Sequence, residues 1–142
     1  MHRSRNQQIK INLSTQIEQN SESNTFEFEV NGSIVEINDA LYIRYNENNN
    51  ASVPVTIKIP RNSEAIQLTR KAAGTHTKLF FNQGQVIPTK YLTPYGKIDI
   101  KVFTSHLEFK DESEKGSLSI DYIISDHHDI LGRYKIRLQF AV

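Results

Sequence analysis

The feature that most constrains the fold of this chain is a strict alternation of apolar and polar residues, clearest at residues 134–142. Apolar side chains occupy every second position there, with Lys135, Arg137 and Gln139 between them. Because successive side chains of a β-strand point to opposite faces of the sheet, this pattern predicts a strand with one buried face. Segments of this kind recur along the chain, about ten in all, at regular spacing.

Short polar turns separate these segments, and no stretch carries a clear helical period. We therefore predict an all-β fold with little or no helix, a single closed antiparallel up-and-down β-barrel of about 8–10 strands over residues 1–142. Residues 1–8 are predicted to form a disordered amino-terminal tail. A β-sandwich fits the same pattern, but a closed barrel also removes the exposed edge strands of a long meander.

Two changes of phase in the alternation predict β-bulges. After Asn31-Gly32 the apolar positions move from even to odd numbers, so that Val35 and Ile37 are expected to point inward. Within residues 97–109 the apolar side chains change phase near Thr104. A residue inserted into one strand of a pair produces such a shift.

Polar stretches and Gly or Pro residues predict the connections. Gln19–Asn24 is predicted as a polar loop and Asn46–Asn50 as an exposed loop. In the stretch Tyr91–Gly96, Pro94 presets a turn and Gly96 can take a positive φ, which indicates a hairpin at this point.

The segment 63–74 is open to two interpretations. Ser63 could cap a short helix that Gly74 ends. The alternative is a strand, which we favour because every neighbouring segment is predicted to be β. In a strand Arg70 would point into the barrel.

The net charge of +1 is distributed unevenly. Residues 1–52 carry 4 Lys/Arg and 7 Asp/Glu, residues 53–110 carry 9 and 3, and residues 111–142 carry 4 and 6, which gives −3, +6 and −2. The basic middle third could contact nucleic acid, but the pI of about 8.0 is below the usual range for such proteins. We therefore expect solvated lysines on outward strand faces and no nucleic-acid partner.

The absence of cysteine excludes disulfides, thiolate metal sites and a cysteine nucleophile. The amino terminus lacks the continuous apolar region of a signal peptide, and no window is long enough to span a membrane. We expect a cytoplasmic protein without a membrane partner.

A set of residues resembles the YwiB-like family of bacterial proteins: Arg70, Gly74, Phe80, Tyr91–Gly96, Thr104, Gly116 and Tyr122. The spacing of these residues is similar to that of the family from about residue 53 to residue 140. The most specific part of the resemblance is the arginine together with the Thr-Pro-Tyr-Gly turn. It implies a calycin-like, lipocalin-like β-barrel. It implies no catalytic residues, because the family has no assigned activity.

Two groups of polar residues are candidates for a metal site or for catalysis. Asp126–Asp129 contains four potential metal ligands, but adjacent residues diverge, so we interpret it as a solvated turn and expect no metal. His76 and His106 are isolated, and no serine lies in a nucleophile-elbow motif that either could activate. Ser105 would point to the strand face opposite His106. We expect no enzyme activity and no cofactor.

Arg70 is the more informative residue, because a charge inside a barrel needs a partner or a ligand. We predict a binding module whose interior or mouth takes a small apolar or amphipathic ligand. The predicted ligand-binding residues are Arg70, Tyr91, Tyr95, His106, Tyr122 and Tyr134. For Arg70 itself, stacking on an aromatic ring at one barrel end is the alternative to binding an anion. For the whole protein, the alternative is an interaction module that binds protein or RNA through an outer strand face or a homodimer contact.

Overall fold

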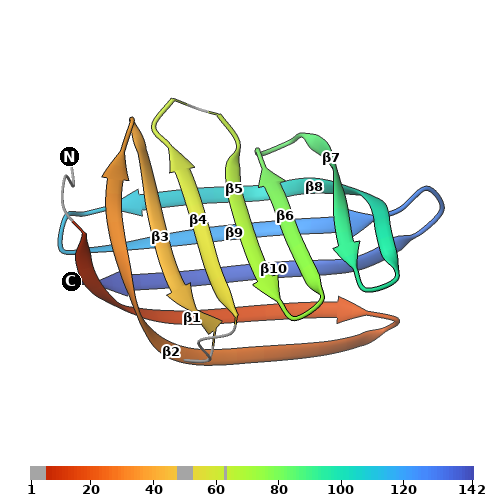
Figure 1. Ribbon diagram of the computed structural model, residues 1–142, viewed down its shortest axis with the longest axis horizontal. Helices are drawn as coiled ribbons and strands as arrows, with labels where there is room; N and C mark the ends of the chain where they lie inside the picture. Colours follow the sequence, from red (N-terminus) through yellow and green to blue (C-terminus); the bar gives the residue numbers. More distant parts are fainter. Residues whose placement is uncertain (1–5, 48–52, 63) are drawn as a thin grey trace.

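Ten antiparallel strands close into one barrel, in which each strand pairs with its neighbours in the sequence (Figure 1). The computed structural model describes residues 6–47, 53–62 and 64–142. The strands, in order, are β1 (Gln7–Gln19), β2 (Glu22–Ile37), β3 (Ala40–Asn46), β4 (Pro54–Pro60), β5 (Ile66–Ala72), β6 (Thr75–Phe81), β7 (Val86–Thr93), β8 (Gly96–Asp111), β9 (Lys115–Ser125) and β10 (Ile130–Ala141). Strand β1 pairs with both β2 and β10, which closes the barrel. The predicted all-β up-and-down barrel is confirmed.

The two walls of the barrel differ in length. Strands β3 to β7 have 7 or 8 residues each, whereas β1, β2, β8, β9 and β10 have 11 to 16. At about 3.3 Å per residue, the long strands extend well beyond the short ones. Figure 1 shows the β1–β2 and β9–β10 hairpins reaching past β3 to β6 on the right of the view. One end of the barrel is therefore incompletely covered.

The inward side chains of the alternating strands fill the opposite end. Its core contains the largest fully buried apolar residues, Phe81, Ile11, Ile34, Leu41, Ile43, Ile57, Leu118, Ile120, Leu138 and Val102. Each such side chain contributes roughly 1.5–3 kcal/mol by leaving water. This buried core stabilises the barrel.

The predicted bulge at Asn31-Gly32 is wrong. Strand β2 stays in continuous register with β1 and β3, so the even-numbered Ile34 is the inward, fully buried residue, and Ile37 is 43% exposed. Glycine is required at position 32 because a Cβ there would lie 2.6 Å from the Arg44 carbonyl oxygen. The glycine permits a close approach between strands and does not mark a bulge.

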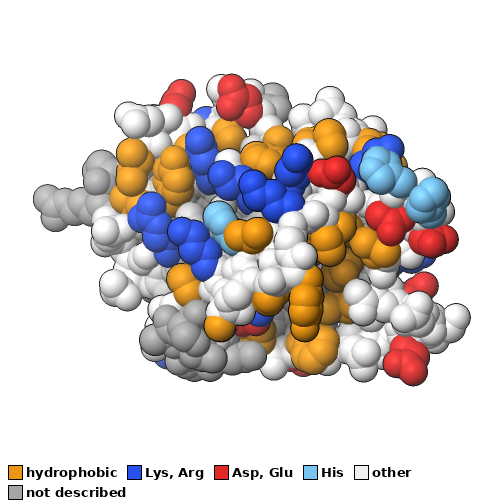
Figure 2. Space-filling view, turned by 45° about the vertical axis from the view of Figure 1, so that its right-hand side comes forward, with side chains coloured by type: hydrophobic (Ala, Val, Ile, Leu, Met, Phe, Trp, Pro, Cys, Tyr) orange, Lys and Arg blue, Asp and Glu red, His pale blue; other side chains and the backbone are white. Residues whose placement is uncertain are grey.

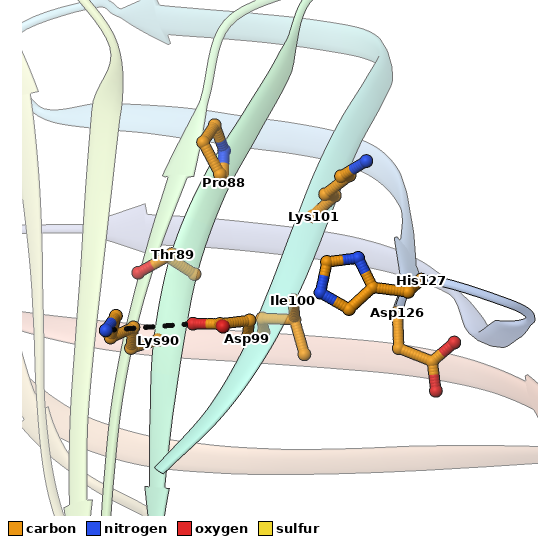
Figure 3. Close-up of a pocket in the computed structure, with 8 residues that line it drawn as sticks. All are labelled: Pro88, Thr89, Lys90, Asp99, Ile100, Lys101, Asp126 and His127. Atoms are coloured by element: carbon orange, nitrogen blue, oxygen red, sulfur yellow. Dashed lines mark ion pairs between the residues drawn. The ribbon is translucent and has the colours of Figure 1, made fainter.

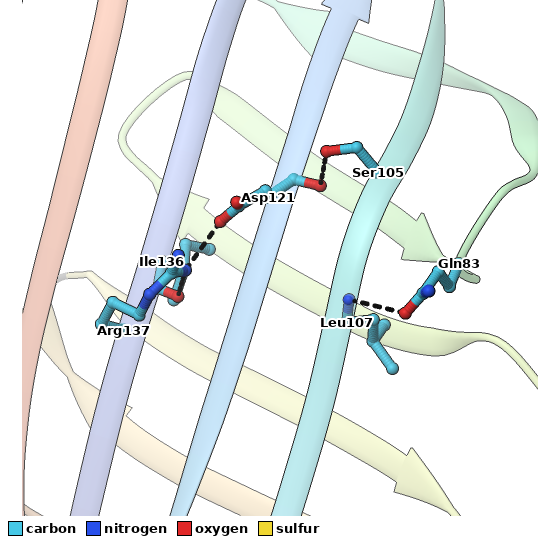
Figure 4. A network of polar contacts seen from close by, with 6 residues as sticks. All are labelled: Gln83, Ser105, Leu107, Asp121, Ile136 and Arg137. Carbon is cyan, nitrogen blue, oxygen red and sulfur yellow. Dashed lines mark hydrogen bonds and ion pairs between the residues drawn. The ribbon is translucent and has the colours of Figure 1, made fainter.

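The predicted bulge near Thr104 is confirmed. The β8–β9 register shifts between Thr104 and His106, and Thr104 and Leu107 both point inward on either side of the shift. The Leu107 amide donates to the side chain of Gln83 at 3.1 Å, which ties the β6–β7 turn to β8 (Figure 4). The bulge thus keeps one apolar face inward along a strand of 16 residues.

Two expectations for the first part of the chain differ from the structure. Gln19–Asn24 is not a loop: β1 and β2 continue to a two-residue turn at Asn20 and Ser21, both with positive φ (49° and 65°). Such turns match the twist of hairpin strands. Strand β1 begins at Gln7, within the predicted tail, and residues 1–5 lie outside the described part of the chain.

The strand interpretation of the segment 63–74 is confirmed by β5, although Ser63 itself is outside the described residues. The hairpin at Pro94 is also confirmed, and Gly96 has a φ of +125°. Of the loop Asn46–Asn50, residues 48–50 lie outside the described residues. Among the residues that are described, no helix has the length and apolar character needed to cross a membrane.

Candidate ligand-binding site

The open end of the barrel contains a cavity of about 550 Å³. Inward side chains from the long strands and from the short strands line it. Its apolar wall comes from β1, β2, β9 and β10 and includes Ile17, Phe28, Ile124 and Ile136. Both charged residues, Arg70 and Glu47, come from the side formed by β3 to β7, here called the polar wall. This wall also contributes Tyr45, Tyr91, Thr77 and the apolar Val55, Ile57, Leu68 and Leu79. The volume falls within the range of small-molecule sites.

Arg70 enters this cavity from the end of β5 and pairs with Glu47, which follows β3. The pair is bidentate, with Nε donating to Oε2 at 2.8 Å and Nη2 donating to Oε1 at 2.9 Å. The two side chains are 35% and 29% exposed. Hydrogen bonding to Glu47 raises the pKa of Arg70 above its ordinary value. Two parallel hydrogen bonds of this kind fix the guanidinium plane as well as its charge.

Tyrosines surround the ion pair on the same wall. Tyr45 and Tyr91 both line the cavity and lie close enough to Arg70 to raise its pKa. Tyr45 is 7% exposed, and burial is the main cause that raises the pKa of its phenol. Among the described residues, neither hydroxyl makes a hydrogen bond to protein. Both are therefore available to a molecule in the cavity.

A second pair of tyrosines forms the floor and the far wall. The rings of Tyr122 and Tyr134 stack with centroids 4.9 Å apart and an interplanar angle of 9°, and Phe81 packs on Tyr122 at 4.6 Å. The Tyr134 hydroxyl accepts a hydrogen bond from Nε2 of Gln19 at 3.1 Å. Burial raises the pKa of the Tyr122 phenol, which stays neutral at physiological pH.

The structure brings together four of the six predicted site residues. Arg70, Tyr91, Tyr122 and Tyr134 all line the cavity. Tyr95 does not, because it occupies the tip of the β7–β8 turn and is fully exposed. Tyr95 is therefore separated from the other predicted ligand-binding residues.

His106 also lies outside the cavity. The bulge in β8 turns its neighbour Leu107 inward, so His106 faces outward opposite Asp121 of β9. The carboxylate of Asp121 instead accepts from Nη1 of Arg137 at 2.7 Å, and Ser105 donates to its carbonyl oxygen (Figure 4). The structure therefore does not bring His106 together with the four predicted residues that line the cavity.

Sequence reasoning missed Glu47 and Tyr45. We expect an aromatic ring or an anionic ligand beside Arg70 from the sequence, yet its partner is a carboxylate 23 positions earlier in the chain. Glu47 sits in a polar, Asn-rich stretch that was interpreted as an exposed loop. The alternation of β3 could have indicated Glu47. Ile43 and Tyr45 point inward, and Glu47 is the next residue that the same alternation places on the inward face.

A second hollow, of about 320 Å³, lies on the outer face of β7 and β8 beside the β9–β10 turn (Figure 3). It is lined by charges of both signs, and the cross-strand neighbours Lys90 and Asp99 form an ion pair at 3.9 Å (Figure 3). Asp126 and His127 are part of its rim. This hollow has no wall of converging polar groups comparable to that of the barrel cavity.

The turn Asp126–Asp129 is held by its own backbone. Oδ1 of Asp126 accepts from the amides of His128 and Asp129 at 2.8 and 2.7 Å, which lowers the pKa of the Asp126 carboxyl. Over the described part of the chain, no group of three or more His, Asp or Glu side chains converges as a metal site would require. The carboxylate caps a turn, as such residues commonly do.

Fold and cavity together define the class of protein: a ten-stranded closed antiparallel barrel with one open end. The chain belongs to a family described as a domain of unknown function, DUF1934, whose profile matches residues 11–138. It is similar to the crystal structure of the YwiB protein from Bacillus subtilis, with a TM-score of 0.79 and 18% identity over 96% of this chain and 92% of that one. No curated protein sequence matches the chain.

Proposed function

We propose that the protein is a non-enzymatic binding module that takes a small amphipathic molecule into the open end of its barrel. The observation that carries this proposal is the cavity of about 550 Å³, whose mostly apolar lining contains one ion pair and a small number of tyrosine and threonine hydroxyls. Apolar cavities with a few converging polar groups are the usual form of small-molecule sites. The apolar part of the ligand would lie against β1, β2, β9 and β10.

The polar lining supports binding more than catalysis. The Arg70 guanidinium and the Glu47 carboxylate are engaged with each other. The raised pKa of Tyr45 and of Tyr122 keeps these phenols protonated at neutral pH. Groups in this state orient a ligand by hydrogen bonds, and they are poor bases and nucleophiles.

The test is fluorescence titration with the uncharged apolar dye N-phenyl-1-naphthylamine. We expect saturable enhancement with the natural protein and at least about tenfold weaker binding with Thr77→Trp, which places a large ring in the cavity. Thr77 lines the cavity from β6. The matched control is Thr69→Trp on β5, because Thr69 pairs with Lys78 on the outer face. Equal binding by both variants would refute the site.

Native mass spectrometry of protein purified from its own host complements the titration. A retained small molecule of constant mass, lost in Thr77→Trp and kept in Thr69→Trp, would identify the physiological ligand. The same spectrum gives the oligomeric state.

A second candidate function rests on the outer face of the short strands. The residues of β3 to β7 include no Asp or Glu, whereas Arg44, Lys58, Lys71, Lys78 and Lys90 all lie on outward positions. In an up-and-down barrel these strands lie side by side, so these five positive charges gather on one wall. Figure 2 shows Lys and Arg side chains in a row across this part of the surface.

This wall would contact the phosphate backbone of a single-stranded RNA without reading its sequence. Anisotropy with a labelled 20-nucleotide RNA at 50 and 200 mM salt tests it. We expect weak, salt-dependent binding that is lost when Lys58, Lys71 and Lys78 are all changed to Gln. A control that changes Lys10, Lys110 and Lys135 to Gln, on the other wall, should bind as before. Salt-independent binding, or equal loss in both variants, would exclude this function.

A further inference from the structure

The cavity contains two charged groups, and they neutralise each other. Of the described residues that line it, Arg70 and Glu47 alone carry charge at neutral pH. Their bidentate contact uses Nε and Nη2 of the guanidinium and both oxygens of the carboxylate. The polar wall therefore has hydrogen-bonding capacity and no net charge.

We propose that the site selects an amphipathic molecule with an uncharged polar head group, such as an alcohol or an amide, over the corresponding carboxylate, and that Glu47 determines this selection. The inference rests on the proposed ligand-binding function and specifies its ligand class. A lone arginine in an apolar barrel would favour an anion. Glu47 occupies the place that the head group of such an anion would take.

An anionic head group meets two obstacles in this arrangement. To reach the favoured donors of Arg70, a ligand carboxylate must displace Glu47 and leave it without its partner in a half-buried position. If Glu47 stays in place, the ligand carboxylate lies beside a like charge and loses its own hydration. Either arrangement disfavours the anion.

An uncharged head group meets neither obstacle. The hydroxyls of Tyr45 and Tyr91 line the same wall and can each donate or accept a hydrogen bond. Glu47 and Arg70 retain lone pairs and N–H groups beyond those of their mutual contact. A ligand hydroxyl or amide can therefore be satisfied while the ion pair stays intact.

Competition between 1-decanol and decanoate tests this selection, because the two molecules share one chain and differ in the charged group. Each displaces N-phenyl-1-naphthylamine from the natural protein and from three variants: Glu47→Gln, Glu47→Gln with Arg70→Gln, and Asp121→Asn. The last removes a paired carboxylate on the outer face and serves as the matched control. Far-ultraviolet circular dichroism confirms that each variant is folded.

We expect the natural protein to bind decanol at least about tenfold more tightly than decanoate. Glu47→Gln should strengthen decanoate binding at least about tenfold and leave decanol within about threefold, because Arg70 then has a free charge. The double variant should lose this gain, and Asp121→Asn should match the natural protein.

A natural protein that prefers decanoate, or a Glu47→Gln variant without the gain, overturns the inference while the binding function stands. Failure of every protein to bind the dye or decanol overturns the binding function itself.

Discussion

The ring of Phe140 in β10 lies directly over Gly116, its partner across the β9–β10 ladder. A Cβ at position 116 would overlap the ring and would also meet the carbonyl oxygen of Lys110 at 2.5 Å. Phe140 is 2% exposed, so the aromatic ring takes the space that a side chain on β9 would fill. This contact closes the packed end of the barrel opposite the cavity.

Gly116→Ala should therefore destabilise the protein. The added methyl group must displace a buried ring and backbone, and overpacking of this kind costs roughly 1–3 kcal/mol. Urea unfolding followed by circular dichroism gives the change in the free energy of unfolding. Ser117→Ala, at the next position on the outer side of the strand, is the control and should change stability by less than about 0.5 kcal/mol. A stable Gly116→Ala variant would mean that Phe140 can move aside.

Stability should fall at alkaline pH. Burial raises the pKa of Tyr45 and of Tyr122 above the ordinary 10.0. Between pH 10 and the raised values, the unfolded chain loses phenolic protons that the folded chain retains, so the free energy of unfolding decreases as pH rises. With two such groups the slope approaches about 2.7 kcal/mol per pH unit.

Urea unfolding at intervals from pH 8 to pH 11.5 measures this slope. Changing both Tyr45 and Tyr122 to Phe should flatten it above pH 10, whereas Ile136→Val, in the same cavity but without a titratable group, should not. An unchanged slope in the double Phe variant would show that other groups control alkaline unfolding.

The ion pair in the cavity should contribute modestly to stability. Arg70 and Glu47 are each about one-third exposed, so solvent screens their attraction, while the bidentate geometry strengthens it. A double-mutant cycle with Arg70→Gln and Glu47→Gln should give a coupling free energy of about 1 kcal/mol. A coupling indistinguishable from zero would show that the two side chains are not held together in solution.

The seam between β6 and β7 should be the first part of the barrel wall to exchange its amide protons. Within these two described strands, the ladder between them has one paired position, His76 with Leu92. Thr89 supplements it by donating through Oγ1 to the Lys78 carbonyl oxygen at 3.0 Å. Hydrogen exchange followed by mass spectrometry should show faster exchange in β6 and β7 than in β9 and β10, because unpaired amides open locally. Equal protection in all four strands would contradict this seam.

The architecture followed from the sequence because period-two alternation reports which face of each strand is buried. The alternation also located the bulge near Thr104, because a regular strand without a bulge would point Val102 and Leu107 to opposite faces. The same reasoning misjudged Asn31-Gly32, since a glycine that permits close strand contact looks identical to one that marks a bulge. Only the pairing of β2 with both neighbours separates the two cases.

The site was predictable in part. Parity placed Arg70, Tyr122 and Tyr134 inside the barrel, and the structure puts all three on the cavity. The partner of Arg70 was not predictable in the same way. Contact between Arg70 and Glu47 depends on where β3 ends relative to β5, which is set by register through β4 and not by any local pattern.

The most direct test of the cavity as a binding site is titration of ¹⁵N-labelled protein with 1-decanol, followed by two-dimensional amide spectra. We predict saturable shifts of amides that border the cavity, among them Arg70, Thr77, Tyr91 and Tyr122, with little change on the outer face at Lys10 and Lys135. Spectra that stay unchanged up to the solubility limit of decanol, or shifts confined to the outer face, would contradict it.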